Sequence, residues 1–186
     1  MRKNFGAKTW VYPMPVFIIS SYDENKKPNA MNAAWGGISE EHQISICISN
    51  DHKTTENILK SKAFCVSIAT SKTVAPCDYV GIVSGNDENQ KMEKAGFTFT
   101  NSEKVNAPII NELPMALECK LISYNKDTCT LIGDIINVSC DEEYLDEKGK
   151  IDINKVEPIT YDPVYHKYIK LGEVVGNAFK DGLKLK

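Results

Sequence analysis

Hydrophobic residues in this chain come mostly in short runs that are separated by polar turns. The apolar run Val16–Tyr22 ends in the turn-rich stretch Asp23–Asn29, after which Ala30–Ala34 resumes an extended pattern of small residues. This arrangement predicts a β-hairpin. Between residues 44 and 48 isoleucine alternates with serine or cysteine, which is the period of a strand with one face on a core.

Short helices are predicted between the strands. Thr54–Lys60 opens with two threonines, carries a carboxylate in its first turn and continues with good helix formers. Phe64–Ile68 returns to strand character, while Val74–Val80 and Asn89–Ala95 have helical patterns. The positive N-terminal end of the first helix is expected to face the loop that precedes it.

The second half of the chain contains a long hairpin. Leu117–Tyr124 and Thr128–Val138 flank the polar turn Asn125–Asp127. Hairpins with few long helices predict a mainly β fold with short helices, in which a closed antiparallel sheet removes exposed edges. A Rossmann sheet is disfavoured because no G-x-G-x-x-G follows a strand. No linker or repeat divides residues 1–186, so we expect a single domain.

Composition narrows the class of protein. Apolar residues make up 42% and charged residues 25% of the chain, and the formal charge is -3 without a basic stripe, so no nucleic-acid partner is expected. The start, Met1–Gly6, lacks the apolar stretch of a signal peptide, and no run is long enough to span a bilayer. We therefore expect a cytoplasmic protein without a membrane partner.

The 6 cysteines lie apart, without a C-x-x-C pair, and most are in strand-like runs. They are interpreted as reduced, buried thiols, with Cys119 packed in a core and Cys77 the better candidate for exposure. The three histidines are far apart, so no metal site is predicted.

Three stretches carry candidate chemistry. In Asn29–Gly37, small side chains leave room for a flat ring, two asparagines supply polar contacts and Trp35 offers an apolar plane. The alternative is a crowded strand crossing in the core, with Trp35 as its plug.

The second stretch, Ser49–Thr55, collects hydroxyls, a cation and free helix amides, which are groups that bind phosphate. It can equally be a polar turn with a helix cap, and Asp51 counts against an anion. The third stretch, Asp78–Gly85 followed by Lys91, can bring a positive charge to a ligand, although ordinary loop chemistry explains its glycines as well.

Together these stretches resemble the flavin reductase-like FMN-binding family, in particular its flavoredoxin branch. The likeness runs from Pro15 to about Phe179. It rests on the order and spacing of several short motifs, namely Pro15-Val16, Asn29 to Trp35, Thr54 before Asn57-Ile58, Ser84-Gly85 with Lys91, Leu117 to Lys120, Gly133 and Leu171-Gly172.

The resemblance implies an FMN-binding split β-barrel that forms a homodimer, with FMN bound non-covalently near the subunit interface. It implies that one group of residues borders the isoalloxazine ring, namely Asn29, Asn32, Ala33, Ala34 and Trp35. A second group takes the ribityl phosphate, namely Ser49, Lys53, Thr54 and Thr55. Lys91 is expected to approach the ring and Tyr161 to lie over the flavin. The chain departs from the family at Thr128–Thr130, where relatives often carry a histidine, and at Lys53, where arginine is common.

The expected function is that of an oxidoreductase, an NAD(P)H-dependent FMN reductase with NADH or NADPH as co-substrate. Flavin chemistry belongs to the cofactor, so no covalent or acid–base catalytic residue is predicted. The alternative is a flavoredoxin-type carrier that keeps its FMN and exchanges electrons with a redox protein partner. A ligand-binding barrel without redox work is a third possibility.

Overall fold

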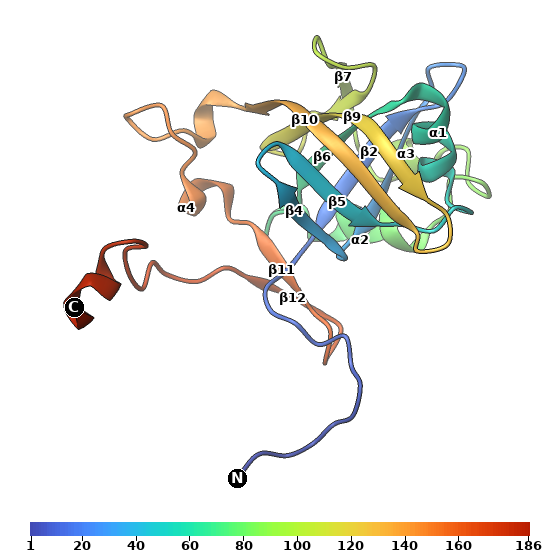
Figure 1. The fold of residues 1–186 in the computed structure, drawn as a ribbon. Coiled ribbons are helices and arrows are strands. Elements are labelled where there is room, and N and C mark those ends of the chain that lie inside the picture. The colour runs from blue at the N-terminus through green and yellow to red at the C-terminus, as the bar shows by residue number, and fades with distance from the viewer.

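The computed structural model describes residues 1–186 and is built around one curled antiparallel sheet (Figure 1). Its strands stand in the order β3 (Pro28–Ala33), β2 (Phe17–Tyr22), β6 (Ala63–Ile68), β9 (Met115–Asn125), β10 (Thr130–Cys140), β5 (Gln43–Cys47) and β4 (Gly36–Glu40). The expected mainly β fold is confirmed. The sheet is a split barrel and is not closed by strand pairing as expected, because β3 and β4 remain its two ends and do not pair with each other.

Two smaller sheets and six short helical segments complete the chain. β1 (Met14–Pro15), β11 (Ile159–Asp162) and β12 (Lys167–Lys170) form one small sheet, and β7 (Phe99–Asn101) pairs with β8 (Pro108–Ile110). The α-helices are α1 (Lys53–Ser61), α2 (Val74–Ile82), α3 (Lys91–Lys94) and α4 (Ile153–Val156), and the 3₁₀ helices are η1 (Glu142–Tyr144) and η2 (Asp181–Leu185). None of the helices has the length and apolar character that crossing a lipid bilayer requires.

The strands predicted from the hydrophobic pattern are confirmed. β2 and β3 form the first hairpin, β5 is the strand of alternating isoleucines, and β9 and β10 form the long hairpin. Ile44, Ile46 and Ile48 are all buried, as the period of two requires. The helix predicted over Asn89–Ala95 is longer than α3, because residues 89 and 90 belong to a turn.

Two hydrophobic clusters lie on opposite faces of the sheet. Ile19 and Phe64 belong to the cluster inside the barrel, which Ile58 of α1 closes at one end. Ile18 and Val80 belong to a second cluster, where α2 packs on the outer face of β2 and β3. Strand β2 is therefore buried along its whole length, which explains why it is an unbroken apolar run in its first half.

Two predictions about single residues are wrong. Cys77, the candidate for exposure, is 1% exposed because it lies on the face of α2 that packs against the sheet. Trp35 does not plug the core, since 54% of it is exposed at the bend between β3 and β4. All six thiols are free, and Cys119 is buried as expected, while Cys47, Cys129 and Cys140 are only partly buried.

Candidate functional site

The N-terminal end of α1 lies open beside strand β3. Residues 49–52 lead from β5 into the helix, and the N-cap residue His52 provides no side-chain cap. The first helical hydrogen bond is made by the amide of Glu56, so the amides of Lys53, Thr54 and Thr55 have no acceptor within the chain. Three free N–H groups at the positive end of a helix are suited to an anion.

A hollow of about 140 Å³ adjoins this helix end. It is lined by Asn29, Met31, His52, Lys53, Thr54, the residues 80–85 and Lys91. Lys91 is only 4% exposed, and its ammonium group makes no hydrogen bond or ion pair with the chain. Burial lowers the pKa of Lys91 to about 8, because the charged form is poorly solvated there.

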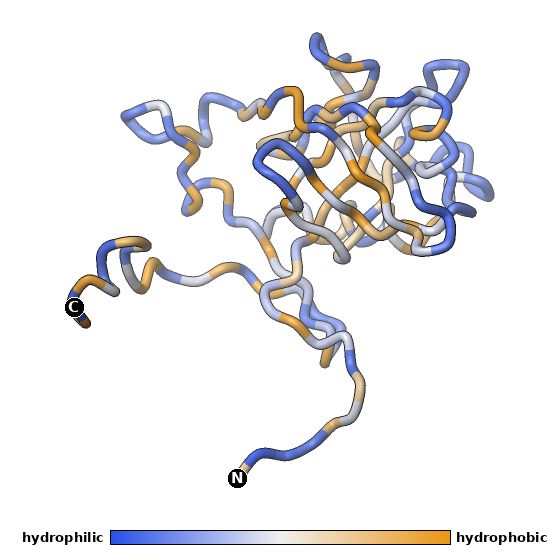
Figure 2. The backbone as a smooth tube through the Cα atoms, viewed as in Figure 1, coloured by the Kyte–Doolittle hydropathy of each residue, from blue (hydrophilic) through white to orange (hydrophobic).

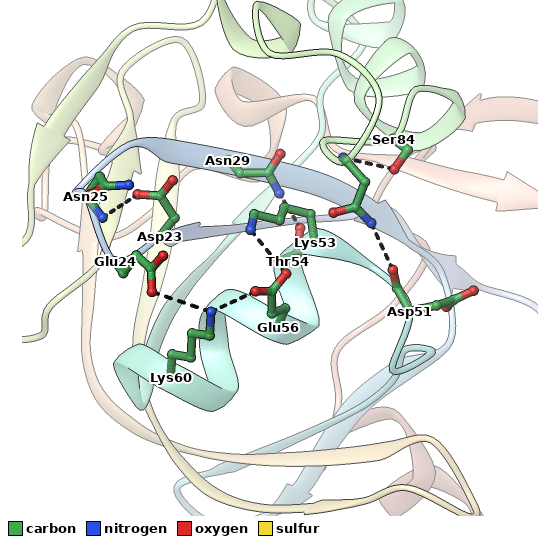
Figure 3. A network of polar contacts seen from close by, with 11 residues as sticks. Asp23, Glu24, Asn25, Asn29, Asp51, Lys53, Thr54, Glu56, Lys60 and Ser84 are labelled. Carbon is green, nitrogen blue, oxygen red and sulfur yellow. Dashed lines mark hydrogen bonds and ion pairs between the residues drawn. The ribbon is translucent and has the colours of Figure 1, made fainter.

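The other cation of this hollow is already paired. Lys53 Nζ lies 3.1 Å from Glu56, and Lys60 lies 2.8 Å from the same carboxylate and 3.6 Å from Glu24 (Figure 3). These two lysines lower the pKa of Glu56. Figure 3 shows the Asp51 side chain directed away from Lys53 and Thr54, so the carboxylate that counted against an anion lies outside the hollow.

A larger hollow of about 330 Å³ shares Asn29, Lys53 and Lys91 with the first. Asn57 of α1 lines it, is fully buried, and has no partner for either its amide nitrogen or its amide oxygen. A buried polar group without a partner costs about 1–3 kcal/mol. Orphaned groups of this kind are expected where a ligand supplies the missing hydrogen bonds.

Further along β3, a third hollow of about 390 Å³ is lined by Asn32, Ala33 and Ala34 together with Asp78, Gly81, Ile82, Tyr161, His166 and Tyr168. Asn32 Nδ2 donates to the carbonyl oxygen of Cys77 at 3.1 Å and to the Tyr168 hydroxyl at 3.4 Å. The Tyr168 hydroxyl in turn donates to Asp78 at 2.7 Å. Burial and Asp78 both raise the pKa of Tyr168, so this tyrosine stays a neutral donor. The network fixes the side chain of Asn32.

Two glycines allow the end of α2 and the loop after it to lie against β3. A Cβ on Gly81 would lie 2.9 Å from Asn32 Cβ, and a Cβ on Gly85 would lie 2.4 Å from Asn29 Oδ1. Any larger residue would displace the asparagines. The third stretch singled out in the sequence is thus brought against the first one by close backbone approach.

The predicted site residues divide into groups. Asn29, Lys53, Thr54 and Lys91 meet at the α1 end, and Asn32, Ala33, Ala34 and Tyr161 meet at the 390 Å³ hollow. Trp35 lies beyond, in a hollow of about 650 Å³ that shares Ala34 with the previous one. Lys91 therefore lies with Lys53 and Thr54, which are expected at the phosphate, and with Asn29, which is expected at the ring.

Two predicted residues lie behind this surface. The Thr55 hydroxyl is fully buried and donates to the Ser49 carbonyl at 2.7 Å, so these residues hold the loop to the helix. The Thr54 hydroxyl accepts from Asn29 Nδ2 at 2.7 Å (Figure 3). Neither Ser49 nor the Thr55 side chain lines the hollows, although the Thr55 amide remains free.

Sequence reasoning missed Asn57, His166 and Tyr168. Asn57 had a signal, because it is a polar residue three positions after Thr54, on the same buried helix face as Ile58. His166 and Tyr168 had none, since only the fold of the β11–β12 hairpin brings them to β3. His166 Nδ1 lies 2.6 Å from the Tyr161 hydroxyl.

Comparison with known proteins gives a consistent result. The sequence model described as "Flavin reductase like domain" matches residues 9–165. The fold superimposes on a flavoredoxin of Desulfovibrio vulgaris (Miyazaki F) with a TM-score of 0.93 and 39% identity, covering 98% of this chain and 100% of that one.

Two other solved structures are also similar. A flavoredoxin from Methanosarcina acetivorans matches with a TM-score of 0.89 and 26% identity over 100% of both chains. Nitrilotriacetate monooxygenase component B from Bacillus cereus matches with a TM-score of 0.74 and 25% identity, over 90% of this chain and 88% of that one.

Proposed function

Because the chain belongs to the family of flavin reductase-like domains, we propose that it binds FMN non-covalently along β3 and acts as an oxidoreductase. The observation that supports this best is the largely buried Lys91, whose ammonium group has no partner in the chain, beside the open N-terminal end of α1. A phosphate monoester is the group that this arrangement fits. The flat strand of small residues leading away from it fits a planar ring.

The residues present fit FMN at both ends. At the phosphate end, Lys91 supplies a positive charge, and the amides of Lys53, Thr54 and Thr55 supply three donors. Asn57, orphaned beside them, can bond to the hydroxyls of a ribityl chain. At the ring end, Ala33 and Ala34 present little bulk.

The protein's own contribution is positional. Asn32 donates its amide N–H groups to Cys77 and Tyr168, which leaves Oδ1 as an acceptor for an N–H at the edge of a heterocycle. Tyr161 and His166 form the aromatic border of the same hollow. FMN, when bound, supplies the redox chemistry by accepting a hydride or electrons and releasing them. Holding two rings in contact is what such a site contributes to the rate.

We propose reduced nicotinamide, NADH or NADPH, as the electron donor, which makes the chain an FMN reductase. The 390 Å³ hollow over β3 is open, and it leaves room for a second ring beside Tyr161 and His166. His166 is the histidine that lines the proposed ring end of the flavin site, although it comes from a different element than the long hairpin where relatives often carry one.

A flavoredoxin-type electron carrier is the second candidate. The 39% identity to a flavoredoxin over nearly the whole chain favours it. In this case the chain would keep its FMN and exchange electrons with a redox protein partner. In either case we propose a homodimer, which fits the large exposed surface described below.

Titration with FMN and riboflavin tests the cofactor. We expect the purified protein to bind FMN and to bind riboflavin at least tenfold more weakly, since riboflavin lacks the phosphate that Lys91 and the helix amides would hold. Equal affinity for the two would reject the phosphate site. A colourless protein that ignores both would support a barrel without redox work.

Stopped-flow absorbance separates the two candidate functions. FMN-loaded protein is mixed with NADH or NADPH, and the flavin band is followed. Bleaching on the timescale of turnover supports the reductase. A band that persists with both nucleotides, yet bleaches with dithionite and recovers with an acceptor protein, supports the carrier.

A further inference from the structure

The last sixteen residues, Leu171–Lys186, form an extended C-terminal arm that leaves the barrel (Figure 1). Its last hydrogen bond to the rest of the chain runs from the Leu171 amide to the Pro158 carbonyl at 3.1 Å. All later hydrogen bonds in the arm are internal, such as those around Asp181. Beyond Leu171, the arm therefore has no hydrogen bond that would hold it against its own barrel.

The C-terminal arm is rich in exposed apolar side chains. Val174 is 78% exposed, Val175 and Phe179 are each 99% exposed, and Leu185 is 92% exposed. Figure 2 shows these hydrophobic stretches along a segment that lies in solvent. Exposed apolar residues gathered on one segment mark a surface that another molecule covers.

The total surface points to the same conclusion. The accessible surface of the chain is 11644 Å². A folded monomer of 20.8 kDa is expected to expose about 8,900 Å², so the excess is about 2,700 Å², to which the C-terminal arm and the exposed N-terminal residues 1–13 both contribute. This excess is of the size that tightly associated homodimers bury.

The barrel carries an apolar groove of about 450 Å³ near the root of the arm. Its lining contains no charged side chain and includes Met14, Phe17, Ile38, Ile44, Leu117 and Ile159. The only hydroxyl in it, that of Thr160, is already bonded to the backbone of Met14. The groove thus offers hydrophobic contact and no unfilled polar group.

We propose that the C-terminal arm of a second copy of this chain lies in this groove, and that the exchange is reciprocal. Leu171 is both the root of the arm and part of the groove rim, so a two-fold axis close to this rim brings each arm to the other subunit's groove. The arm supplies the apolar residues and the groove supplies the apolar walls. This inference rests on the proposed homodimer and names the segment that holds it together.

The exchange also concerns the proposed flavin site. The groove shares Pro13, Met14, Pro15 and Gly36 with the hollow at Trp35. An arm in the groove would therefore border the far end of the surface along β3. In this position the arm of one subunit would lie next to the proposed cofactor surface of the other.

Sedimentation velocity over a range of protein concentrations tests the exchange. The double variant Val175→Asp/Phe179→Asp places two charges where the arm should meet the groove, and we expect its dimer dissociation constant to rise roughly tenfold or more. Lys180→Glu, a charge change at another exposed position of the same arm, should stay within about threefold of the wild type. A double variant that dissociates like the wild type would overturn the inference while leaving the dimer in place.

Hydrogen exchange locates the contact. Residues 36–38 and 158–160 should take up deuterium faster in the double variant than in the wild type, because the groove would be uncovered. Unchanged exchange there would show that the arm lies elsewhere. A wild-type protein that sediments as a monomer would reject both the dimer and the arm exchange, whereas the FMN titration would still report on the cofactor site independently.

Discussion

The side chain of Lys91 is largely buried, and its ammonium group forms no ion pair with a carboxylate. Burying a charge in this way is unfavourable, and proteins retain such groups where they act on a ligand. Two other lysines nearby behave differently, since the half-buried Lys53 and the exposed Lys60 share the carboxylate of Glu56. The positive charge available to an anion is therefore that of Lys91.

Replacing Lys91 by methionine should weaken FMN binding and leave riboflavin binding nearly unchanged. A charge-assisted contact contributes about 1.5–3 kcal/mol, so we expect the dissociation constant for FMN to rise about tenfold to a hundredfold. Lys94→Met, on the same short helix but exposed, is the matched control. Fluorescence titration measures both variants, and equal losses for FMN and riboflavin would contradict the assignment.

The same substitution should change how stability depends on pH. In the folded protein without cofactor the pKa of Lys91 falls from 10.5 to about 8. Between these two pH values Lys91 is protonated in the unfolded chain but largely neutral in the folded protein. The free energy of unfolding of the wild type should therefore increase as the pH rises from about 8 to 10.5. At pH 7 the methionine variant should be more stable by up to about 3 kcal/mol. Urea denaturation at pH 7 and pH 10 tests this, and a gap between the two proteins that does not narrow at pH 10 would argue against it.

FMN affinity should show the opposite trend with pH. Lys91 is charged only below its pKa, so the wild-type affinity for FMN should fall as the pH rises above about 8. A bound phosphate raises this pKa, so the fall should begin at a somewhat higher pH than 8. Lys91→Met should lack this fall. Titrations between pH 7 and pH 10 measure it, and parallel curves for the two proteins would contradict the role of Lys91.

At the scale of elements, the packing of the Phe64 ring of β6 against β10, two strands away in the sheet, depends on one residue without a side chain. A Cβ on Gly133 of β10 would lie 2.3 Å from Cζ of Phe64, which is fully buried in β6. The register of β9 and β10 shifts beside Gly133, so the strand bends where it crosses the ring. The barrel interior has no space for a methyl group at this point.

Gly133→Ala should destabilise the protein by about 1–3 kcal/mol, the usual effect of overpacking a core. Gly37→Ala is the matched control, because a Cβ there meets nothing within 4 Å. Thermal and urea denaturation of both variants measures the difference. Equal stability of the two would mean that Phe64 moves aside without cost.

At the scale of the whole molecule, cofactor binding and folding should be coupled. A ligand that binds only the folded state at 100 times its dissociation constant adds about 2.7 kcal/mol to stability. FMN should therefore raise the melting temperature, and riboflavin at the same concentration should raise it less. Differential scanning calorimetry measures both, and a melting temperature that neither compound changes would reject a flavin site.

The hydrophobic pattern by itself determined helix α1 and every barrel strand except β4, including the long hairpin. These elements depend on local periodicity: the alternation at Ile44, Ile46 and Ile48 specifies a strand whatever lies opposite it. The small residues of β3 and the threonines of α1 were also visible in the sequence. Strand β4 and the β11–β12 hairpin were not predicted, although each strand pairs with its neighbour in the chain, because these strands are only 4 or 5 residues long and lack a clear apolar run.

Only the tertiary structure decided how the candidate site is assembled. It buried Lys91 and Asn57 at the same hollow, exposed Trp35 and turned Thr55 inward. Burial and hydrogen-bond satisfaction are properties of a residue's surroundings, and these come from distant segments. The sequence therefore determined which chemical groups the chain carries and where along the chain its main strands lie. Folding decided which of these groups remain without a hydrogen-bond partner.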